Sequence, residues 1–260
     1  MTQVITIANN KGGVGKTMQA YQLSTYLAHL GNKVLVIDLD SQANLSSTLG
    51  VEVRRTLIPE WLIGDVDYKD VICKSEGKYD FHENLDVIPA SRHLANLAKL
   101  LILSEAEVRK TAGRKERLLR MRINQLEDKY DYVVIDTPPM LGDELIMALV
   151  ASTRVLIPTQ AQDYSIDGLE ELMDTFEIIK ESENQKLEFN IIPSMVNARR
   201  KLEKIRLEEL AQSFNVTPSI RNLVEMQESI SLRKPLFLMN KKSKGRNDYT
   251  NLYDSLGFNS

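Results

Sequence analysis

Short apolar runs rich in Val and Ile recur along the chain, and longer stretches with helical spacing separate them. Runs that are apolar on both faces are typical of central strands in a parallel sheet. Their alternation with helices predicts an α/β fold, with a mostly parallel central sheet flanked by helices and ligands at the carboxyl ends of the strands. The expected strands are VITIA (4–8), KVLVID (33–38), LDVIPA (85–90), YDYVVID (130–136), RVLIPT (154–159) and FNIIPSMV (189–196). The expected helices cover 17–30, 91–103, 167–180 and 201–214.

The length of the chain and two irregular stretches complete the expected organisation. A chain of 260 residues with 43% hydrophobic content can bury a full core, and we expect one domain that spans 1–260. The segment 53–84 fits no regular pattern and is expected to form a helical or irregular insertion, with Trp61 packed in a core. The basic run at 109–122 is expected to be the solvated face of a helix.

Charge and cysteine content limit the possible partners. The chain has 33 Lys and Arg against 36 Asp and Glu, a net charge of -3, so nucleic-acid binding would have to come from local patches. The one cysteine, Cys73, excludes an internal disulfide and cannot hold a metal cluster alone, and we expect a structural thiol. No signal peptide and no membrane-spanning stretch is apparent, which predicts a cytoplasmic protein.

A glycine-rich stretch, ANNKGGVGKT at 8–17, follows the first expected strand and opens the first expected helix. This arrangement is typical of a P-loop, because backbone N–H groups and the helix N-terminus converge on phosphate oxygens. Lys16 is expected to contact the β- and γ-phosphates of a nucleotide, and the Thr17 hydroxyl to bind Mg²⁺. Asn10 replaces the usual first glycine of G-x-x-x-x-G-K-[ST], and asparagine tolerates positive φ. The glycines that let the backbone approach closely are Gly12, Gly13 and Gly15.

Three aspartates stand at the ends of expected strands. Asp38 and Asp40 end the second strand in KVLVIDLDSQ, and Asp136 follows four apolar residues in YDYVVIDTPP. Carboxylates at strand ends beside a P-loop lie where Mg²⁺ and an attacking water need them. Each aspartate could instead cap a helix, but the three together with the glycine loop favour a nucleotide and magnesium site.

The residues KGGVGKT, VLVIDLDSQAN and YDYVVIDTPP resemble the deviant Walker A ATPases of the ParA/MinD superfamily, and their wider spacing is similar to that of ParA-type DNA partition ATPases. The likeness continues through NLDVIPAS, STRVLIPTQAQDYSIDGLEEL, RKPLFL and KSKGR, and covers nearly the whole chain. It implies a P-loop NTPase fold of the deviant Walker A class, with ATP and Mg²⁺ as cofactors. It also implies ATP hydrolysis that stays slow until a partner organises the site.

The resemblance implies roles for individual residues. Lys11 matches the additional lysine that reaches across a nucleotide-sandwich homodimer to the partner's phosphates, and Gly12 would let the two loops approach. Asp40 resembles the residue that positions the attacking water, Asp38 a carboxylate near the Mg²⁺ shell, and Asp136 the Walker B aspartate. The implied catalytic residues are Lys11, Lys16 and Asp40, the metal-binding residues are Thr17, Asp38 and Asp136, and the nucleotide-binding residues are Lys11, Gly12, Gly13, Val14, Gly15, Lys16, Thr17, Met18 and Asn197.

Two positions depart from the family pattern. Met18 stands where a second Thr or Ser usually follows Thr17, and we expect altered packing without loss of catalysis. Asn197 lies in SMVNARR, which resembles the adenine-recognition segment, although many ParA-type proteins carry Asp there. Its amide offers a donor and an acceptor to a base edge, and an ordinary turn asparagine after a strand is the open alternative.

Related branches of the superfamily fit the sequence less well. The tail NDYTNLYDSLGFNS lacks the basic amphipathic helix of a MinD-like membrane anchor, so we expect no membrane contact. A nitrogenase-reductase-like protein needs cysteines for a cluster, and Cys73 alone does not provide them. Because the chain begins at the P-loop strand, we expect the small form without an N-terminal helix-turn-helix domain.

Clustered Lys and Arg near the C-terminus are the expected contacts to non-specific double-stranded DNA, because phosphate binding needs clustered charge and no base readout. A solvated terminus is the open alternative. The cluster in RKPLFLMNKKSKGR, together with one upstream arginine, comprises Arg221, Arg233, Lys234, Lys241, Lys242, Lys244 and Arg246.

We therefore expect a small ParA-type ATPase, nucleoid-associated in the cytoplasm, that segregates a plasmid or chromosome. ATP would build the sandwich homodimer, which coats DNA, and a centromere-binding partner resembling ParB or a ribbon-helix-helix adaptor would stimulate hydrolysis and release it. One alternative is a MinD-like or cargo-positioning ATPase switch that acts on a protein cargo. Another is a metabolic P-loop enzyme such as a carboxylating synthetase, for which nothing in the sequence marks a small-molecule pocket.

Overall fold

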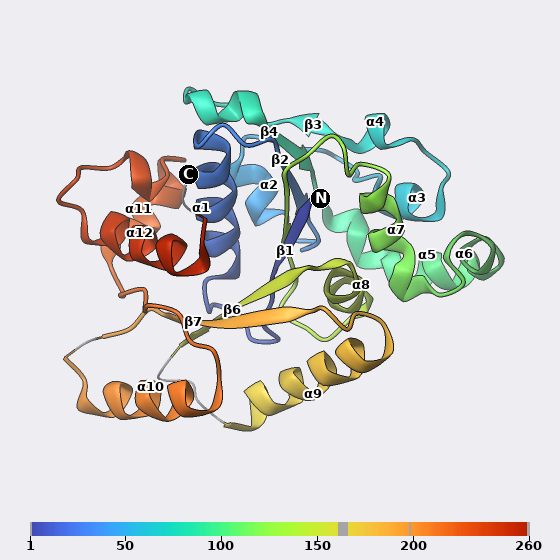
Figure 1. Ribbon diagram of the computed structural model, residues 1–260. Helices are drawn as coiled ribbons and strands as arrows, with labels where there is room; N and C mark the ends of the chain where they lie inside the picture. The colour runs from blue at the N-terminus through green and yellow to red at the C-terminus, as the bar shows by residue number, and fades with distance from the viewer. Residues whose placement is uncertain (1, 161–165, 198, 259–260) are drawn as a thin grey trace.

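A seven-stranded sheet in the order β3-β4-β2-β5-β1-β6-β7 forms the centre of the computed structural model (Figure 1), which describes residues 2–160, 166–197 and 199–258. The neighbouring strands are parallel except β3 and β4, which are antiparallel. The α/β fold with a mostly parallel sheet is confirmed. The strands are β1 (Gln3–Ile7), β2 (Val34–Asp38), β3 (Cys73–Lys74), β4 (Leu85–Ile88), β5 (Tyr132–Asp136), β6 (Arg154–Gln160) and β7 (Glu188–Ser194).

Helices cover both faces of the sheet, with α1, α11 and α12 on one side and α3, α5, α7 and α8 on the other, while α9 and α10 lie along β6 and β7 (Figure 1). The helices are α1 (Lys16–His29), α2 (Asn44–Thr48), α3 (Ile58–Ile63), α4 (Tyr68–Val71), α5 (Leu97–Leu103), α6 (Glu105–Ala112), α7 (Leu118–Asn124), α8 (Asp143–Ala151), α9 (Ile166–Ser182), α10 (Lys201–Ser213), α11 (Val224–Ser231) and α12 (Lys244–Leu256). Short 3₁₀ turns cover Asp80–Asn84, Arg92–Asn96, Lys115–Arg117 and Leu236–Leu238.

Alternate strand residues point to opposite faces, and each face has its own apolar core. Val36 of β2 packs in the core under α1 and α12, whereas its neighbour Leu35 packs in the core under α3, α5, α7 and α8. Burial on both faces explains why the strands read as continuous apolar runs. Trp61 is buried in the second of these cores, as predicted.

The segment 53–84 combines α3, α4, the edge strand β3 and a 3₁₀ turn. Cys73 pairs with Val87 and Lys74 with Asp86 across the antiparallel β3–β4 ladder. The Cys73 thiol is half-buried, and burial raises its pKa, so it is less reactive than an exposed cysteine. These contacts fit the expected structural role of the thiol.

Two sequence-based expectations for helices are wrong in part. The helix expected over 91–103 starts as a 3₁₀ turn, because the Ser91 hydroxyl accepts from the His93 N–H, and becomes α-helical only at Leu97. The basic run 109–122 is not one solvated helix, since Gly113 ends α6 with φ +74°. Within it, Arg117 Nε donates to Glu183 Oε2 at 2.7 Å, and the Glu183 side chain is only 5% exposed.

The segment 215–220 runs beside β7 and covers part of this edge strand. The Ile191 N–H donates to the Asn215 carbonyl, and the Thr217 N–H donates back to the Ile191 carbonyl, both at 2.9 Å. Further along, the Val196 N–H donates to the Ile220 carbonyl at 2.9 Å.

Over the parts of the chain that are described, no helix is both long and apolar enough to span a bilayer.

Candidate nucleotide site

The glycine loop lies at the centre of the sheet, where β1 runs between β5 and β6 and leads into α1. Gly13 and Gly15 have φ values of +75° and +96°, which glycine adopts without steric cost. Gly15 is the N-cap of α1 and supplies no side-chain cap, so the first N–H groups of α1 face the loop. This is the geometry that a P-loop uses to bind phosphate.

Asn10, at the position of the usual first glycine, has a negative φ. Among the described non-glycine residues, positive φ occurs at Ala43, Met195 and Arg233. Asn10 therefore does not use the positive φ that asparagine tolerates, and the tight turn of the loop rests on Gly13 and Gly15.

Side chains that the sequence analysis did not single out hold the loop in place. Asn9 is buried; its Nδ2 donates to the Pro158 carbonyl and its Oδ1 accepts from the Lys11 N–H, both at 2.9 Å. Gln160, at the end of β6, donates from Nε2 to the Gly13 carbonyl at 2.7 Å. Asn9 follows β1 and Gln160 ends β6, and a polar residue at the carboxyl end of a strand is the signal that could have identified them.

Lys16 lies inside the loop, and the residue is only 7% exposed. Its ammonium Nζ donates to the Lys11 carbonyl at 2.8 Å. Burial lowers the pKa of Lys16, while the charges of Asp136 and Asp40 raise it. A cation that is buried beside carboxylates and glycine backbone is well placed to meet phosphate oxygens.

Thr17 and Asp136 meet under the loop, as the sequence predicted. The Thr17 hydroxyl donates to Asp136 Oδ2 at 2.8 Å. Burial raises the pKa of Asp136, and the nearby charge of Asp38 raises it further. The other carboxylate oxygen, Oδ1, is buried and has no hydrogen-bond partner among the described residues. An oxygen that lacks a donor, next to a threonine hydroxyl, fits a hard divalent cation such as Mg²⁺.

Asp38 is fully buried beside Asp136, since the β2–β5 register pairs the two residues. Its Oδ2 accepts from the Ser46 N–H at 2.9 Å and the Ser46 hydroxyl at 2.6 Å, and its Oδ1 accepts from the Asp40 N–H at 3.1 Å. Burial raises the pKa of Asp38 to about 6, although these hydrogen bonds oppose the shift. With donors of the chain on both oxygens, Asp38 is better suited to orienting its neighbours than to direct metal binding.

Asp40 is half-buried and lies in the turn after β2. Its Oδ1 accepts from the Gln42 N–H at 2.9 Å, and its carbonyl accepts from the Ala43 N–H at 2.8 Å. Ala43 has a φ of +56°, so the turn that carries Asp40 has a defined, tight shape. The three aspartates are thus gathered at the carboxyl ends of β2 and β5.

The remaining loop residues differ in exposure. Lys11 and Gly12 are exposed, and Val14 is buried. A Cβ on Gly12 would meet the Pro139 Cβ at 3.8 Å, which is ordinary van der Waals contact. Met18 is half-buried, and its sulfur accepts from the Gln22 amide at 3.4 Å.

Asn197 sits in an exposed turn after β7. Its Oδ1 accepts from the Arg199 N–H at 3.2 Å, and its own N–H donates to Glu203 Oε2 at 2.7 Å. These contacts favour the turn asparagine over base recognition. Met195 instead brings this segment to the loop, because its sulfur contacts Gln160 Nε2 at 3.0 Å, and its Cε would lie 3.6 Å from a Cβ on Gly15.

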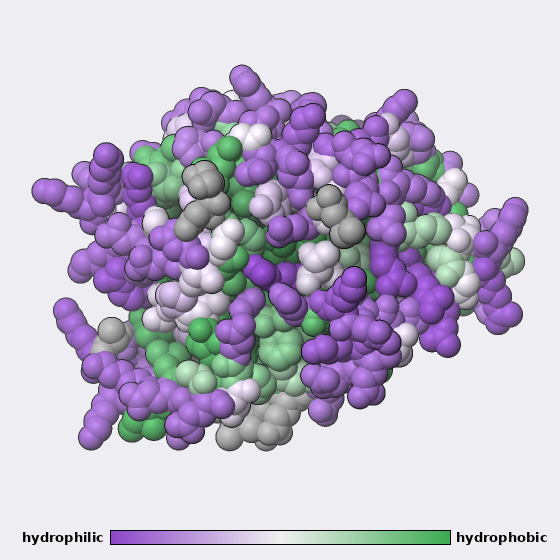
Figure 2. Space-filling view, in the orientation of Figure 1, coloured by the Kyte–Doolittle hydropathy of each residue, from purple (hydrophilic) through white to green (hydrophobic). Residues whose placement is uncertain are grey.

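The basic cluster divides into structural and exposed members. The Arg221 guanidinium pairs with Asp248, with Nη2 and Oδ1 2.6 Å apart, and Arg246 donates to the Met239 carbonyl at 3.1 Å. Lys234 is half-buried. Figure 2 shows protruding hydrophilic side chains on this side of the molecule, over α11 and α12. The exposed cations are Arg233, Lys241, Lys242 and Lys244.

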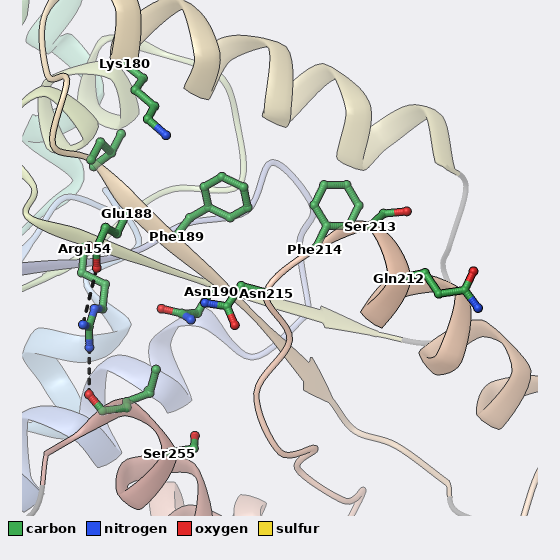
Figure 3. Close-up of a pocket in the computed structure, with 12 residues that line it drawn as sticks. Arg154, Lys180, Glu188, Phe189, Asn190, Gln212, Ser213, Phe214, Asn215 and Ser255 are labelled. Atoms are coloured by element: carbon green, nitrogen blue, oxygen red, sulfur yellow. Dashed lines mark hydrogen bonds and ion pairs between the residues drawn. The ribbon is translucent and has the colours of Figure 1, made fainter.

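A hollow of about 620 Å³ lies at the amino ends of β6 and β7 (Figure 3), whereas the glycine loop follows the carboxyl end of β1. Its lining includes Arg154 and Glu188, the first residues of β6 and β7, and the rings of Phe189 and Phe214. Ligands of α/β proteins bind at the carboxyl ends of strands, so this hollow is separate from the nucleotide site.

Comparison with known proteins shows the family of the chain. A family model for the AAA domain matches residues 2–189. The sporulation initiation inhibitor protein Soj of Bacillus subtilis is 35% identical and aligns over 100% of both chains. The chromosome partitioning protein ParA of Caulobacter vibrioides is 34% identical over 96% of this chain and 92% of its own.

A solved structure carries the same fold with ligands bound. Cobyrinic acid a,c-diamide synthase of Mycobacterium smegmatis, with a bound ATP analog and magnesium, has a TM-score of 0.80 at 25% identity, over 98% of this chain and 94% of its own. On its fold, its glycine loop and its full-length similarity to Soj and ParA, the protein belongs to the ParA/Soj family of P-loop partition proteins.

Proposed function

We propose that this protein is a DNA partition ATPase that works as an ATP-dependent clamp. Two chains close around two nucleotides, the dimer binds double-stranded DNA non-specifically at the nucleoid, and hydrolysis releases it. A centromere-binding partner of the ParB or ribbon-helix-helix type stimulates that hydrolysis. The observation that carries this proposal is the partly buried hydrogen bond of Thr17 to Asp136 under a glycine loop, in a chain that aligns with Soj from end to end.

Thr17 and Asp136 are the residues that would hold Mg²⁺. Within the described ranges, no group of three or more His, Cys, Asp or Glu side chains could hold a metal by itself, so phosphate oxygens and water must supply further ligands. Bound Mg²⁺ would neutralise charge that develops on the phosphates. Lys16 would exchange its bond to the Lys11 carbonyl for phosphate oxygens, and Asp40 would orient the attacking water.

Dimer closure is proposed to act through Lys11 and Gly12. Both residues are exposed beside the loop, and neither the φ of Gly12 nor its neighbours within the described chain require glycine there. A requirement for a small residue would then come from a second copy of the loop. Lys11 of one subunit would add positive charge to the phosphates of the other only when the dimer forms.

DNA binding is proposed for the exposed cations Arg233, Lys241, Lys242 and Lys244. Four cations per chain give a modest patch, and dimer formation places two such patches on one particle. Because the second patch binds at a high effective concentration, DNA affinity should depend strongly on ATP. Since the contacts are to phosphates, affinity should fall steeply as salt rises.

The fold alone does not distinguish partition from metabolic chemistry, since the synthase above shares it. Partition is favoured because Soj and ParA are 35% and 34% identical across nearly the full length, against 25% for the synthase. The same dimer cycle could also position a protein cargo, and DNA binding is the property that separates these functions.

The test is binding to a random-sequence DNA duplex with ATP, with ADP and without nucleotide, over a salt series. Lys11→Ala is compared with Lys186→Ala, an exposed lysine near the start of β7. We expect tight, salt-sensitive binding only with ATP, lost in Lys11→Ala and kept in Lys186→Ala. If ATP drives dimerisation but no condition gives DNA binding, the DNA role is wrong, and a cargo-positioning switch takes its place.

A further inference from the structure

Ser46, in α2, forms hydrogen bonds to the last residue of β2 and to the chain just after β4. It is buried; its hydroxyl donates to Asp38 Oδ2 at 2.6 Å and accepts from the Ala90 N–H at 3.0 Å. Asp38 ends β2, and Ala90 lies two residues after β4. The direction of both bonds is fixed when Asp38 is ionised. An ionised carboxylate can only accept a hydrogen bond, and a backbone N–H can only donate one. The hydroxyl therefore ties the ends of β2 and β4 to α2.

The Asp38 carboxylate passes this constraint on to Asp40. One oxygen accepts two bonds from Ser46, and the other accepts the Asp40 N–H at 3.1 Å. A carboxylate is planar, so fixing one oxygen restricts rotation of the group and hence the position of the other oxygen. The backbone of Asp40 is thereby held by a chain of bonds that starts at Ser46.

We infer that Ser46 is a positioning residue for Asp40: by orienting Asp38, it fixes the turn that carries the side chain proposed to orient the attacking water. The expected effect on ATP turnover rests on the proposed ATPase function, whereas the effect on the Asp40 turn does not. Ser46 itself is not proposed to contact the nucleotide. Nucleotide binding depends on the glycine loop and Lys16, so loss of the Ser46 hydroxyl should affect turnover and leave nucleotide affinity unchanged.

A purely structural role is the competing explanation. The N-cap residue of α2, Ala43, supplies no side-chain cap, and the bond from the Ser46 N–H to Asp38 replaces it. A serine that only supports this short helix would change stability. It would change neither the exposure of the Asp40 N–H nor the turnover rate at saturating ATP.

The test compares Ser46→Ala with Ser24→Ala, which removes another buried hydroxyl, bonded to the Tyr21 carbonyl of its own helix α1. Ser46→Thr restores the hydroxyl. Three quantities are measured for each protein: kcat for ATP hydrolysis, Kd for ADP, and hydrogen exchange of the Asp40 amide. The amide exchange is measured on the nucleotide-free protein and needs no ATPase activity.

For Ser46→Ala we expect kcat to fall about tenfold, with Kd within about twofold of wild type, and Asp40 amide exchange to rise about tenfold. Ser46→Thr should recover most of kcat, and Ser24→Ala should resemble wild type. Unchanged Asp40 exchange in Ser46→Ala overturns the inference whatever the turnover. A fall in kcat that Ser24→Ala reproduces also overturns it. If wild type hydrolyses no ATP while the Asp40 amide responds, the proposed function is wrong, and only the positioning of the Asp40 turn by Ser46 stands.

Discussion

The two buried carboxylates at the ends of β2 and β5 should make the metal-free protein less stable as pH rises. Burial raises the pKa of both Asp38 and Asp136, so the folded state binds protons more tightly than the unfolded state. An acid with a raised pKa contributes stability that is complete below its unfolded pKa. That contribution is lost as pH rises through the folded pKa.

The size of the effect can be worked out for Asp38. Its pKa of about 6 compares with an ordinary value of 3.8, a difference of roughly two units. At about 1.4 kcal/mol per unit, the free energy of unfolding should lose on the order of 3 kcal/mol over this window. About half of that loss falls between pH 5 and pH 7.5. Asp136 adds a loss of the same sign.

Urea unfolding in EDTA at pH 5 and pH 7.5 measures this loss. We compare wild type with Asp136→Asn, which removes one buried charge, and with Asp174→Asn, which removes an exposed one. Asp136→Asn should lose less stability than wild type between the two pH values and should be the more stable protein at pH 7.5. Asp174→Asn should follow wild type. Equal pH dependence in Asp136→Asn and wild type would refute the reasoning, because the carboxylate would then titrate normally in the fold.

Four further substitutions test the site, the core and the basic cluster. Thr17→Ala should weaken ATP binding about tenfold in Mg²⁺ but little in EDTA; equal losses in a calorimetric titration would exclude Thr17 as a metal ligand. Trp61→Ala should lower the free energy of unfolding by about 3–5 kcal/mol, measured by circular dichroism, and a loss near zero would mean that the indole is not packed. Arg221→Ala should destabilise the fold through Asp248. Lys241→Ala should instead leave stability unchanged and reduce the slope of the logarithm of the DNA-binding constant against the logarithm of salt concentration by about 1. If Lys241→Ala lowers stability and Arg221→Ala lowers the salt slope, Lys241 is the structural residue and Arg221 the DNA contact.

The central strands could be predicted from the sequence because burial on both faces leaves a continuous apolar run that has no other explanation. The edge strand Cys73–Lys74 could not, since two residues give no periodicity and its partner at Asp86 and Val87 is set by tertiary pairing. The break at Gly113 could have been predicted, because glycine commonly ends a helix with positive φ.

The residues of the site also fall into those that could be predicted from the sequence and those that could not. Lys16, Thr17 and Asp136 could be identified because a P-loop is a local motif and strand ends converge at one edge of the sheet. Asn9, Gln160, Met195 and Ser46 were missed, because each acts through a contact with a distant segment. Ser46, for example, bonds Ala90, 44 positions away. Ser46 and Met195 have no signature within their own stretches of sequence, whereas Asn9 and Gln160 could have been suspected from their place at the ends of β1 and β6.

The two edges of the sheet limit how copies of this protein can join. β3 offers only two residues, and β7 is covered at Ile191 and Pro193 by the segment that includes Asn215 and Ile220. Continuous strand pairing between molecules, the usual route to aggregation through open edges, is therefore restricted. Contacts between copies of this protein are therefore expected to form mainly through side chains and not through shared strands.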